Sequence, residues 1–179
     1  MNPIIKLVLL VALFFPACTM RKSPEIISQI PLSEKPDTPM TDPETIQKVE
    51  HILNRVKNIS ERTLLDDLGR STMGESVSLM DIGEPSALII AMKLKEPGNW
   101  KYRFWMVDML GYVGGEMNIT PLIEIIEDSS EDIRVRLRAC ESIKEMKLQQ
   151  AVPALLISRD IVNDKRILEE INKSIEYLR

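Results

Sequence analysis

The chain has 179 residues, of which 44% are hydrophobic and 4% are aromatic, and its formal net charge is −4. This length suits one domain of ordinary size. Because 27 acidic residues outnumber 23 basic ones and no basic stripe occurs along the chain, the composition excludes a nucleic-acid-binding function.

The first 17 residues have the composition of a secretory signal peptide. Lys6 supplies one positive charge, and residues 7–15 are all apolar, a run too short to span a bilayer, which takes about 20 residues. Ala17 and Cys18 follow, and this order resembles the signal of bacterial lipoproteins, in which a small residue precedes a cysteine that is lipidated. The resemblance implies a palmitate-bearing membrane anchor at Cys18. The alternative is an ordinary signal peptide followed by an unmodified cysteine.

A lipidated Cys18 would place the protein in the bacterial cell envelope, since each acyl CH₂ buried in a membrane contributes about 0.8 kcal/mol. Thr19 follows the cysteine, where some inner-membrane lipoproteins carry Asp as a retention signal, and this favours the outer membrane over the inner one. Residues 18–42 are rich in proline, which removes backbone donors and blocks helices, so they are predicted to form an extended tether.

Residues 43–82 are predicted to form N-terminal capping helices or a degenerate repeat. Asp42 is a good helix cap, and Pro43 suits the first helical position because its missing N–H has no partner there anyway. The expected elements are a helix from residue 43 to about residue 57, a second helix capped by Ser60 and ending near Gly69, a turn at 70–74 and a short helical segment at 77–80.

Residues 83–179 contain three copies of one pattern: a proline-started apolar helix, a polar turn and a second helix. The second helices align at offsets of 33 and 32 residues, and each has apolar residues at its first, fifth, ninth and twelfth positions, which is the spacing of one helix face. A two-helix unit of this length predicts an all-α fold of the α-solenoid class. The first helices begin at Pro85, Pro121 and Pro153, the second helices occupy 102–113, 135–146 and 167–178, and the predicted repeats are 83–117, 118–150 and 151–179.

The shared residues resemble those of the HEAT-repeat family in its short bacterial form, which also occurs in proteins related to phycobilisome lyases. They are the helix-starting prolines, Asp128 and Asp160 at the ends of first helices, Val135-Arg136 with Ala139, Tyr102-Arg103, and the run from Gly111 to Gly114. The last copy departs from the pattern, with Leu168 in place of arginine. The resemblance covers a little over half of the chain and implies an interaction scaffold, with no catalytic residue.

The first repeat differs from the others on the stripe expected to face solvent. Trp105 stands where the later copies have Arg138 and Glu170, and three extra residues in the preceding turn lead to Trp100. Large aromatics among charges are typical of an interaction surface, whereas the alternative is that Trp105 packs on the N-terminal cap and Trp100 closes its own turn. The candidate partner-binding residues are Trp100, Trp105, Tyr112, Arg134 and Arg138.

No residue pattern predicts catalysis. His51 has no second His or Cys at a metal-ligand spacing, and Cys140 has no histidine after it, so both are predicted to be structural. The acidic residues of 124–132 lack the glycine that a calcium loop needs. We therefore predict a non-enzymatic, membrane-anchored scaffold without metal or cofactor that binds an unidentified protein. The alternatives are an enzymatic role, as in lyase-related HEAT proteins, and a ligand-carrying role that requires a closed apolar pocket between the cap and the first repeat.

Overall fold

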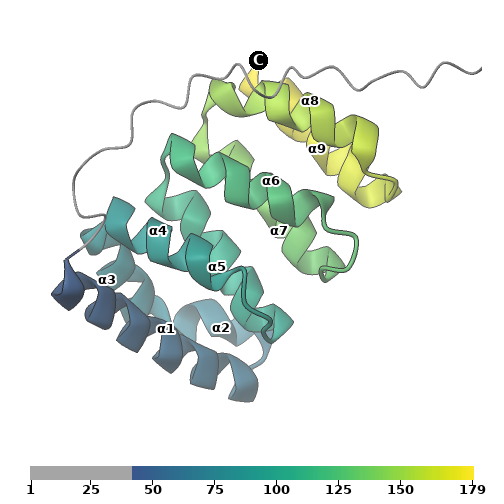
Figure 1. Cartoon of the computed structure of the whole chain (residues 1–179). Coiled ribbons are helices and arrows are strands. Elements are labelled where there is room, and N and C mark those ends of the chain that lie inside the picture. The colour runs from purple at the N-terminus through teal and green to yellow at the C-terminus, as the bar shows by residue number, and fades with distance from the viewer. Residues whose placement is uncertain (1–41) are drawn as a thin grey trace, which may run out of the picture. The chain divides into compact units, whose positions relative to one another are not determined.

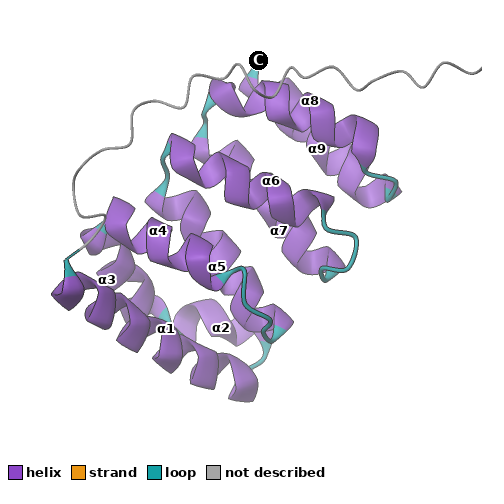
Figure 2. Ribbon diagram, viewed as in Figure 1, coloured by secondary structure: helices purple, strands orange, loops and turns teal. Residues whose placement is uncertain are grey.

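The computed structural model describes residues 42–179, which form nine α-helices and two short 3-10 turns and contain no strand (Figures 1 and 2). This confirms the predicted all-α class. The helices are α1 (Pro43–Arg62), α2 (Leu65–Ser71), α3 (Met73–Ile82), α4 (Glu84–Lys93), α5 (Trp100–Val113), α6 (Ile119–Glu127), α7 (Ile133–Met146), α8 (Val152–Ile161) and α9 (Lys165–Leu178), and the 3-10 turns are η3 (Glu116–Asn118) and η4 (Gln149–Ala151). The predicted signal peptide, Cys18 and all but the last residue of the predicted tether lie outside the described residues.

The helices stack in two layers. One layer holds α1, α4, α6 and α8, and the other holds α3, α5, α7 and α9 (Figure 1). The closest packing within the second layer joins α5 to α7 and α7 to α9, so each repeat contacts the repeats beside it. This nearest-neighbour arrangement is that of an α-solenoid. Among helices α1 to α9, none combines the length and the apolar character that a membrane span requires.

Side-chain caps determine where the second helix of each repeat begins. Asn99, Asp132 and Asp164 each accept a hydrogen bond from a backbone N–H in the first turn of α5, α7 and α9, respectively. These helices therefore begin two residues earlier than the aligned segments predicted, at Trp100, Ile133 and Lys165. Their ends, at Val113, Met146 and Leu178, are where the sequence places them.

The start of α6 differs from the prediction. Pro121 was expected to open this helix, but it is the third residue of α6, because the chain enters the helix directly from η3 at Asn118. The side-chain amide of Asn118 is buried and donates to the carbonyls of Leu110, at 3.2 Å, and Gly114, at 2.6 Å. Asn118 thus fixes the end of α5 against the start of α6.

The apolar stripes found in the sequence form the core. At the first, fifth and ninth aligned positions of α5, α7 and α9 the side chains are at most 8% exposed. They are Tyr102, Met106, Leu110, Val135, Ala139, Ile143, Ile167, Ile171 and Ile175. Burial of each large aliphatic side chain stabilises the fold by about 1.5–3 kcal/mol, so this face carries much of the folding free energy.

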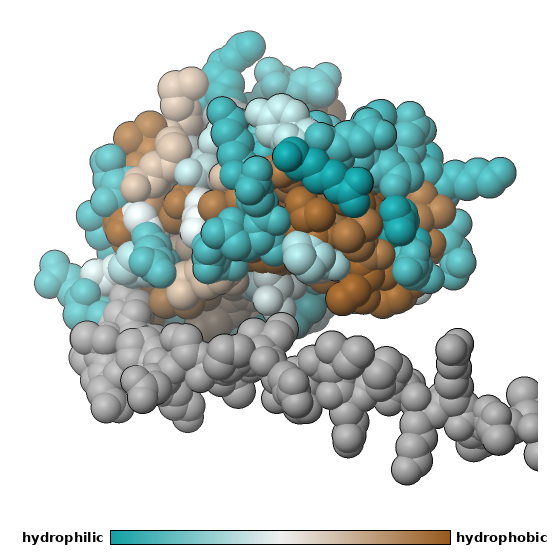
Figure 3. All heavy atoms as spheres, turned by 90° about the horizontal axis from the view of Figure 1, so that it is seen from above, coloured by the Kyte–Doolittle hydropathy of each residue, from teal (hydrophilic) through white to brown (hydrophobic). Residues whose placement is uncertain are grey.

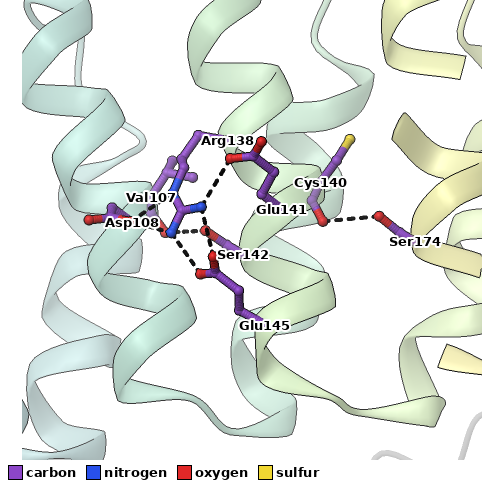
Figure 4. A network of polar contacts seen from close by, with 8 residues as sticks. All are labelled: Val107, Asp108, Arg138, Cys140, Glu141, Ser142, Glu145 and Ser174. Carbon is purple, nitrogen blue, oxygen red and sulfur yellow. Dashed lines mark hydrogen bonds and ion pairs between the residues drawn. The ribbon is translucent and has the colours of Figure 1, made fainter. Parts of the chain in front are cut away.

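A recurring serine joins the second helices. Ser142 Oγ of α7 donates to the Val107 carbonyl of α5 at 3.0 Å, and one repeat later Ser174 Oγ of α9 donates to the Cys140 carbonyl of α7 at 3.2 Å (Figure 4). The backbones of α5 and α7 approach closely at this point. A Cβ added to Gly111 would lie 2.9 Å from Ser142 Cβ and 3.0 Å from Ser142 Cα, so only glycine fits there.

The N-terminal cap contains more helix than predicted. Ser60 does not cap a second helix but lies inside α1, where its Oγ donates to the Lys57 carbonyl at 2.7 Å. Only Thr72 separates α2 from α3, and its Oγ1 donates back to the Leu68 carbonyl at 2.8 Å. The predicted turn at 70–74 is therefore reduced to Thr72, and residues 77–80, predicted as a single helical turn, belong to the ten-residue helix α3.

Candidate functional site

An apolar groove of about 270 Å³ lies between α3 and α5 in the second layer, and it opens to solvent. Four of its side chains are exposed: Met73 by 63%, Val77 by 47%, Met80 by 42% and Tyr112 by 57%. Large apolar side chains gathered at one place on a surface are typical of an interaction site. An open groove, rather than a closed pocket, is therefore what lies between the cap and the first repeat.

Trp105 lines this groove but does not project into solvent. The sequence placed it on the stripe expected to face solvent, and that expectation is wrong, because Trp105 is 2% exposed. The reason is that α3 packs beside α5, so the stripe is covered at Trp105 although Tyr112 farther along it stays exposed. The alternative, that Trp105 packs on the N-terminal cap, agrees with its burial beside α3. The Nε1 of Trp105 is buried and finds no hydrogen-bond acceptor within residues 42–179. A buried donor without a partner costs about 1–3 kcal/mol, so Trp105 carries an unsatisfied polar group.

Arg138 of α7 pairs with Asp108 of α5 and so links these two neighbouring helices. Its guanidinium donates to Asp108 at 2.6 Å, to Glu141 at 3.0 Å and to Glu145 at 2.7 Å (Figure 4). The expected solvent exposure of Arg138 is also wrong, since only 8% of the residue is accessible. Burial raises the pKa of Asp108, although the nearby Arg138 charge opposes this shift. Three carboxylates surround one guanidinium, so the cluster carries excess negative charge.

Trp100 and Arg134 form a stacked pair at the starts of α5 and α7. The Arg134 guanidinium lies 3.3 Å from the centre of the Trp100 ring, a cation–π contact, and its Nε also donates to Asp132 Oδ1 at 2.8 Å. Trp100 is half-buried and Arg134 is exposed. The longer turn of the first repeat therefore brings Trp100 onto the next repeat.

The five residues selected from the sequence thus lie in three places: Trp105 and Tyr112 at the groove, Trp100 and Arg134 in the stacked pair, and Arg138 in the carboxylate cluster. Tyr112 is the one whose ring is both exposed and in the groove, with Trp105 buried beside it. The exposed residues that sequence reasoning missed are Met73, Val77 and Met80. Their spacing of four and three residues is that of one helix face and was available in the sequence, but it lay across a segment predicted to be a turn.

The arginines of the shared repeat pattern have structural roles. Arg103 donates to the carbonyls of Leu94, at 2.8 Å, and Glu96, at 2.7 Å, and pairs with Glu131. One repeat later Arg136 donates to the Ile126 carbonyl at 2.7 Å. Both satisfy backbone acceptors at the end of a first helix, which otherwise lack partners. A larger hollow of about 510 Å³ is lined by the Arg103–Glu131 pair together with further polar residues and with apolar ones such as Ala91, Leu94 and Ile125.

The two residues considered for catalysis are not in the groove. His51 is exposed on α1. Cys140 is completely buried in α7, and this burial raises the pKa of its thiol to about 12. Residues 42–179 contain no group of three or more His, Cys, Asp and Glu side chains placed to hold a metal ion.

A second apolar surface lies at the α8–α9 end of the solenoid. Ile89 and Ile125 hold the same position in α4 and α6 and are 8% and 7% exposed, but their equivalent Ile157 in α8 is 60% exposed, and Ile161 is 52% exposed. Figure 3 looks onto this end and shows hydrophobic surface gathered on one side. The exposure arises because no further helix pair within the described chain covers α8.

No family model and no curated protein matches the sequence. Among solved structures, the chain is similar to human deoxyhypusine hydroxylase in complex with glycerol, with a TM-score of 0.56 and 15% sequence identity. The match covers 75% of this chain and 44% of the hydroxylase chain, so the aligned part is less than half of that protein. The likeness supports a HEAT-like helical fold, and at this identity it extends to the fold alone.

The same match corrects one expectation. We predicted from the repeats that the protein is not an enzyme, but a protein named as a hydroxylase has a fold of this kind. A HEAT-like fold is therefore no argument against catalysis, and that prediction is withdrawn.

Proposed function

We propose that this protein is a lipid-anchored HEAT-like repeat protein of the bacterial envelope that binds another protein through the groove between α3 and α5. The observation that carries the binding role is the row of exposed apolar side chains, Met73, Val77, Met80 and Tyr112, on the second layer. Exposed apolar area of this kind is stabilised when a partner covers it, at about 25 cal/mol per Å² of apolar surface.

The anchoring role is supported by the sequence alone. The apolar run of residues 7–15, Ala17 and Cys18 resemble a lipoprotein signal, and the proline-rich stretch before α1 would hold the helical repeats away from the membrane. Mass spectrometry of the N-terminal peptide tests this part, with Cys18 expected to be diacylated or triacylated and N-terminal. An unmodified Cys18, or cleavage elsewhere, would contradict it.

The binding role is tested by crosslinking in intact cells followed by purification of the tagged full chain. Val77→Gln removes one exposed apolar side chain from the groove, and Leu64→Gln removes an exposed apolar side chain outside it, Leu64 being 76% exposed on the cap. We expect a partner that is enriched with the wild-type chain and with Leu64→Gln and lost with Val77→Gln. Equal enrichment of the partner with all three chains would show that the groove is not the binding site.

A further inference from the structure

The shape of the groove suits a helix. Its α3 wall presents Met73, Val77 and Met80, which are spaced by four and three residues and form a ridge along that helix, and its α5 wall presents Trp105, Met109 and Tyr112 at the equivalent spacing. Two such ridges leave a channel into which the ridge of a third helix packs. Methionine suits this role because its flexible thioether adapts to the shape of a partner.

One residue of the groove wall has a hydrogen-bond donor without an acceptor in the described part of the chain. The indole N–H of Trp105, a residue that lines the groove, is buried and has no partner in residues 42–179. An occupant that is purely hydrocarbon would leave this donor unsatisfied.

One edge of the groove is acidic, at Asp108. We call Asp108 and the carboxylates Glu141 and Glu145, which share Arg138 with it, the acidic rim. Asp108 lines the groove and joins the Arg138 cluster, in which Glu141 and Glu145 bring the excess to two negative charges. In α2, whose Gly69 lines the groove, Asp66 and Asp67 outnumber Arg70. Charges of this sign attract a cationic partner and repel an anionic lipid surface within a Debye length, about 8–10 Å at physiological salt.

We propose that the partner segment in the groove is an amphipathic helix whose apolar stripe lies on Met73, Val77, Met80 and Tyr112 and whose Lys or Arg residues lie over the rim of Asp108, Glu141 and Glu145. This inference rests on the proposed function, because it names the chemistry of the partner at the same groove. The occupant is a protein segment and not the membrane, since the rim would repel anionic lipid.

The test uses synthetic helical peptides of about 18 residues, or five turns, and the full chain purified in detergent. One peptide has a Leu and Ala stripe flanked by Lys, a second has the same stripe flanked by Glu, and a third has the composition of the first in an order that destroys the stripe. Binding is followed through the Trp105 indole N–H resonance, which the Trp100→Phe variant distinguishes from that of Trp100.

The Lys-flanked peptide should bind at least about tenfold more tightly than the other two and weaken between about 50 mM and about 500 mM salt. Val77→Gln should weaken it at least about tenfold, and Leu64→Gln should leave it unchanged. Glu145→Gln keeps an acceptor for Arg138 but removes a rim charge, so it should weaken the Lys-flanked peptide about two- to fivefold, as expected of one exposed ion pair.

Three results would overturn the inference. Equal binding of the Lys- and Glu-flanked peptides would remove the role of the rim, and equal binding of the scrambled peptide would remove the role of the stripe. Val77-dependent binding of phosphatidylglycerol vesicles in place of peptide would identify a membrane surface instead. In each case the cellular crosslinking result stands independently, so failure of the inference is distinguishable from failure of the proposed function.

Discussion

The close approach of α5 and α7 at Gly111 makes Gly111→Ala an informative perturbation. In an open helix this change stabilises by about 1 kcal/mol, because alanine loses less backbone entropy than glycine. Here the new Cβ would lie 2.9 Å from Ser142 Cβ and 3.0 Å from Ser142 Cα. Rotation of the serine side chain cannot move either atom away, because the Cβ position is set by the backbone, so the two helices must separate.

Overpacking of this kind costs about 1–3 kcal/mol, and separation also stretches the Ser142–Val107 hydrogen bond, worth about 1 kcal/mol. After the helix-propensity gain is subtracted, we expect Gly111→Ala to lower the free energy of unfolding by about 1–3 kcal/mol in urea titrations followed by circular dichroism. Gly74→Ala is the matched control, because a Cβ on Gly74 in α3 meets nothing within 4 Å, and it should raise stability by up to about 1 kcal/mol.

A double variant tests whether crowding against Ser142 causes the loss of stability. Adding Ser142→Gly to Gly111→Ala removes the Cβ and Oγ atoms that crowd the new methyl group but leaves the α7 backbone in place, so part of the lost stability should return relative to Ser142→Gly alone. If Gly111→Ala were as stable as the wild type, or if it gained as much as Gly74→Ala, the reasoning from close backbone approach would be refuted.

Three further predictions concern buried polar groups. In a Cys18→Ser chain, Cys140 should resist alkylation at pH 8 until urea is added. Burial raises the pKa of the Cys140 thiol from 9.0 to about 12, so the free energy of unfolding should fall as the pH rises from 9.0 to about 12. Urea titrations at successive pH values would detect this fall. Asn118→Ala removes the side-chain donor to the carbonyls of Gly114 and Leu110, of which Leu110 keeps the Gly114 N–H, and it should cost about 1–3 kcal/mol in thermal unfolding. Arg138→Met leaves the half-buried Asp108 unpaired and should lower the free energy of unfolding by about 2–4 kcal/mol. Adding Asp108→Asn should restore part of this loss. Arg134→Met, at an exposed position, should lower it by under about 1 kcal/mol.

The repeat architecture was predictable because its cause is local in sequence. Apolar residues at helical spacing had to be buried somewhere, and the recurrence of the same spacing in residues 102–113, 135–146 and 167–178 showed that neighbouring copies bury one another. The ends of these helices were therefore correct. Their starts were two residues late, because the caps Asn99, Asp132 and Asp164 lie upstream of the apolar stripe that defined the alignment.

The groove was not predictable, because its cause is tertiary. The burial of Trp105 depends on α3, a helix that could not be aligned with the repeats and that the glycines at 69 and 74 had suggested was interrupted. Both glycines lie within helices, with Thr72 bonded back to Leu68 between them. Likewise Arg138 occupies a surface position by spacing, and its burial became visible only with Asp108 of the preceding repeat beside it.

The exposed isoleucines at the α8–α9 end bear on how such a protein changes its length over evolution. Ile157 occupies the position at which Ile89 and Ile125 are buried. If α6 and α7 were duplicated at this end, the new helix pair would pack on an apolar surface of the same kind as the one on which α8 packs. Gene duplication can thus add repeats, and deletion can remove them, as whole helix pairs without a new core, while the groove at the opposite end keeps its shape.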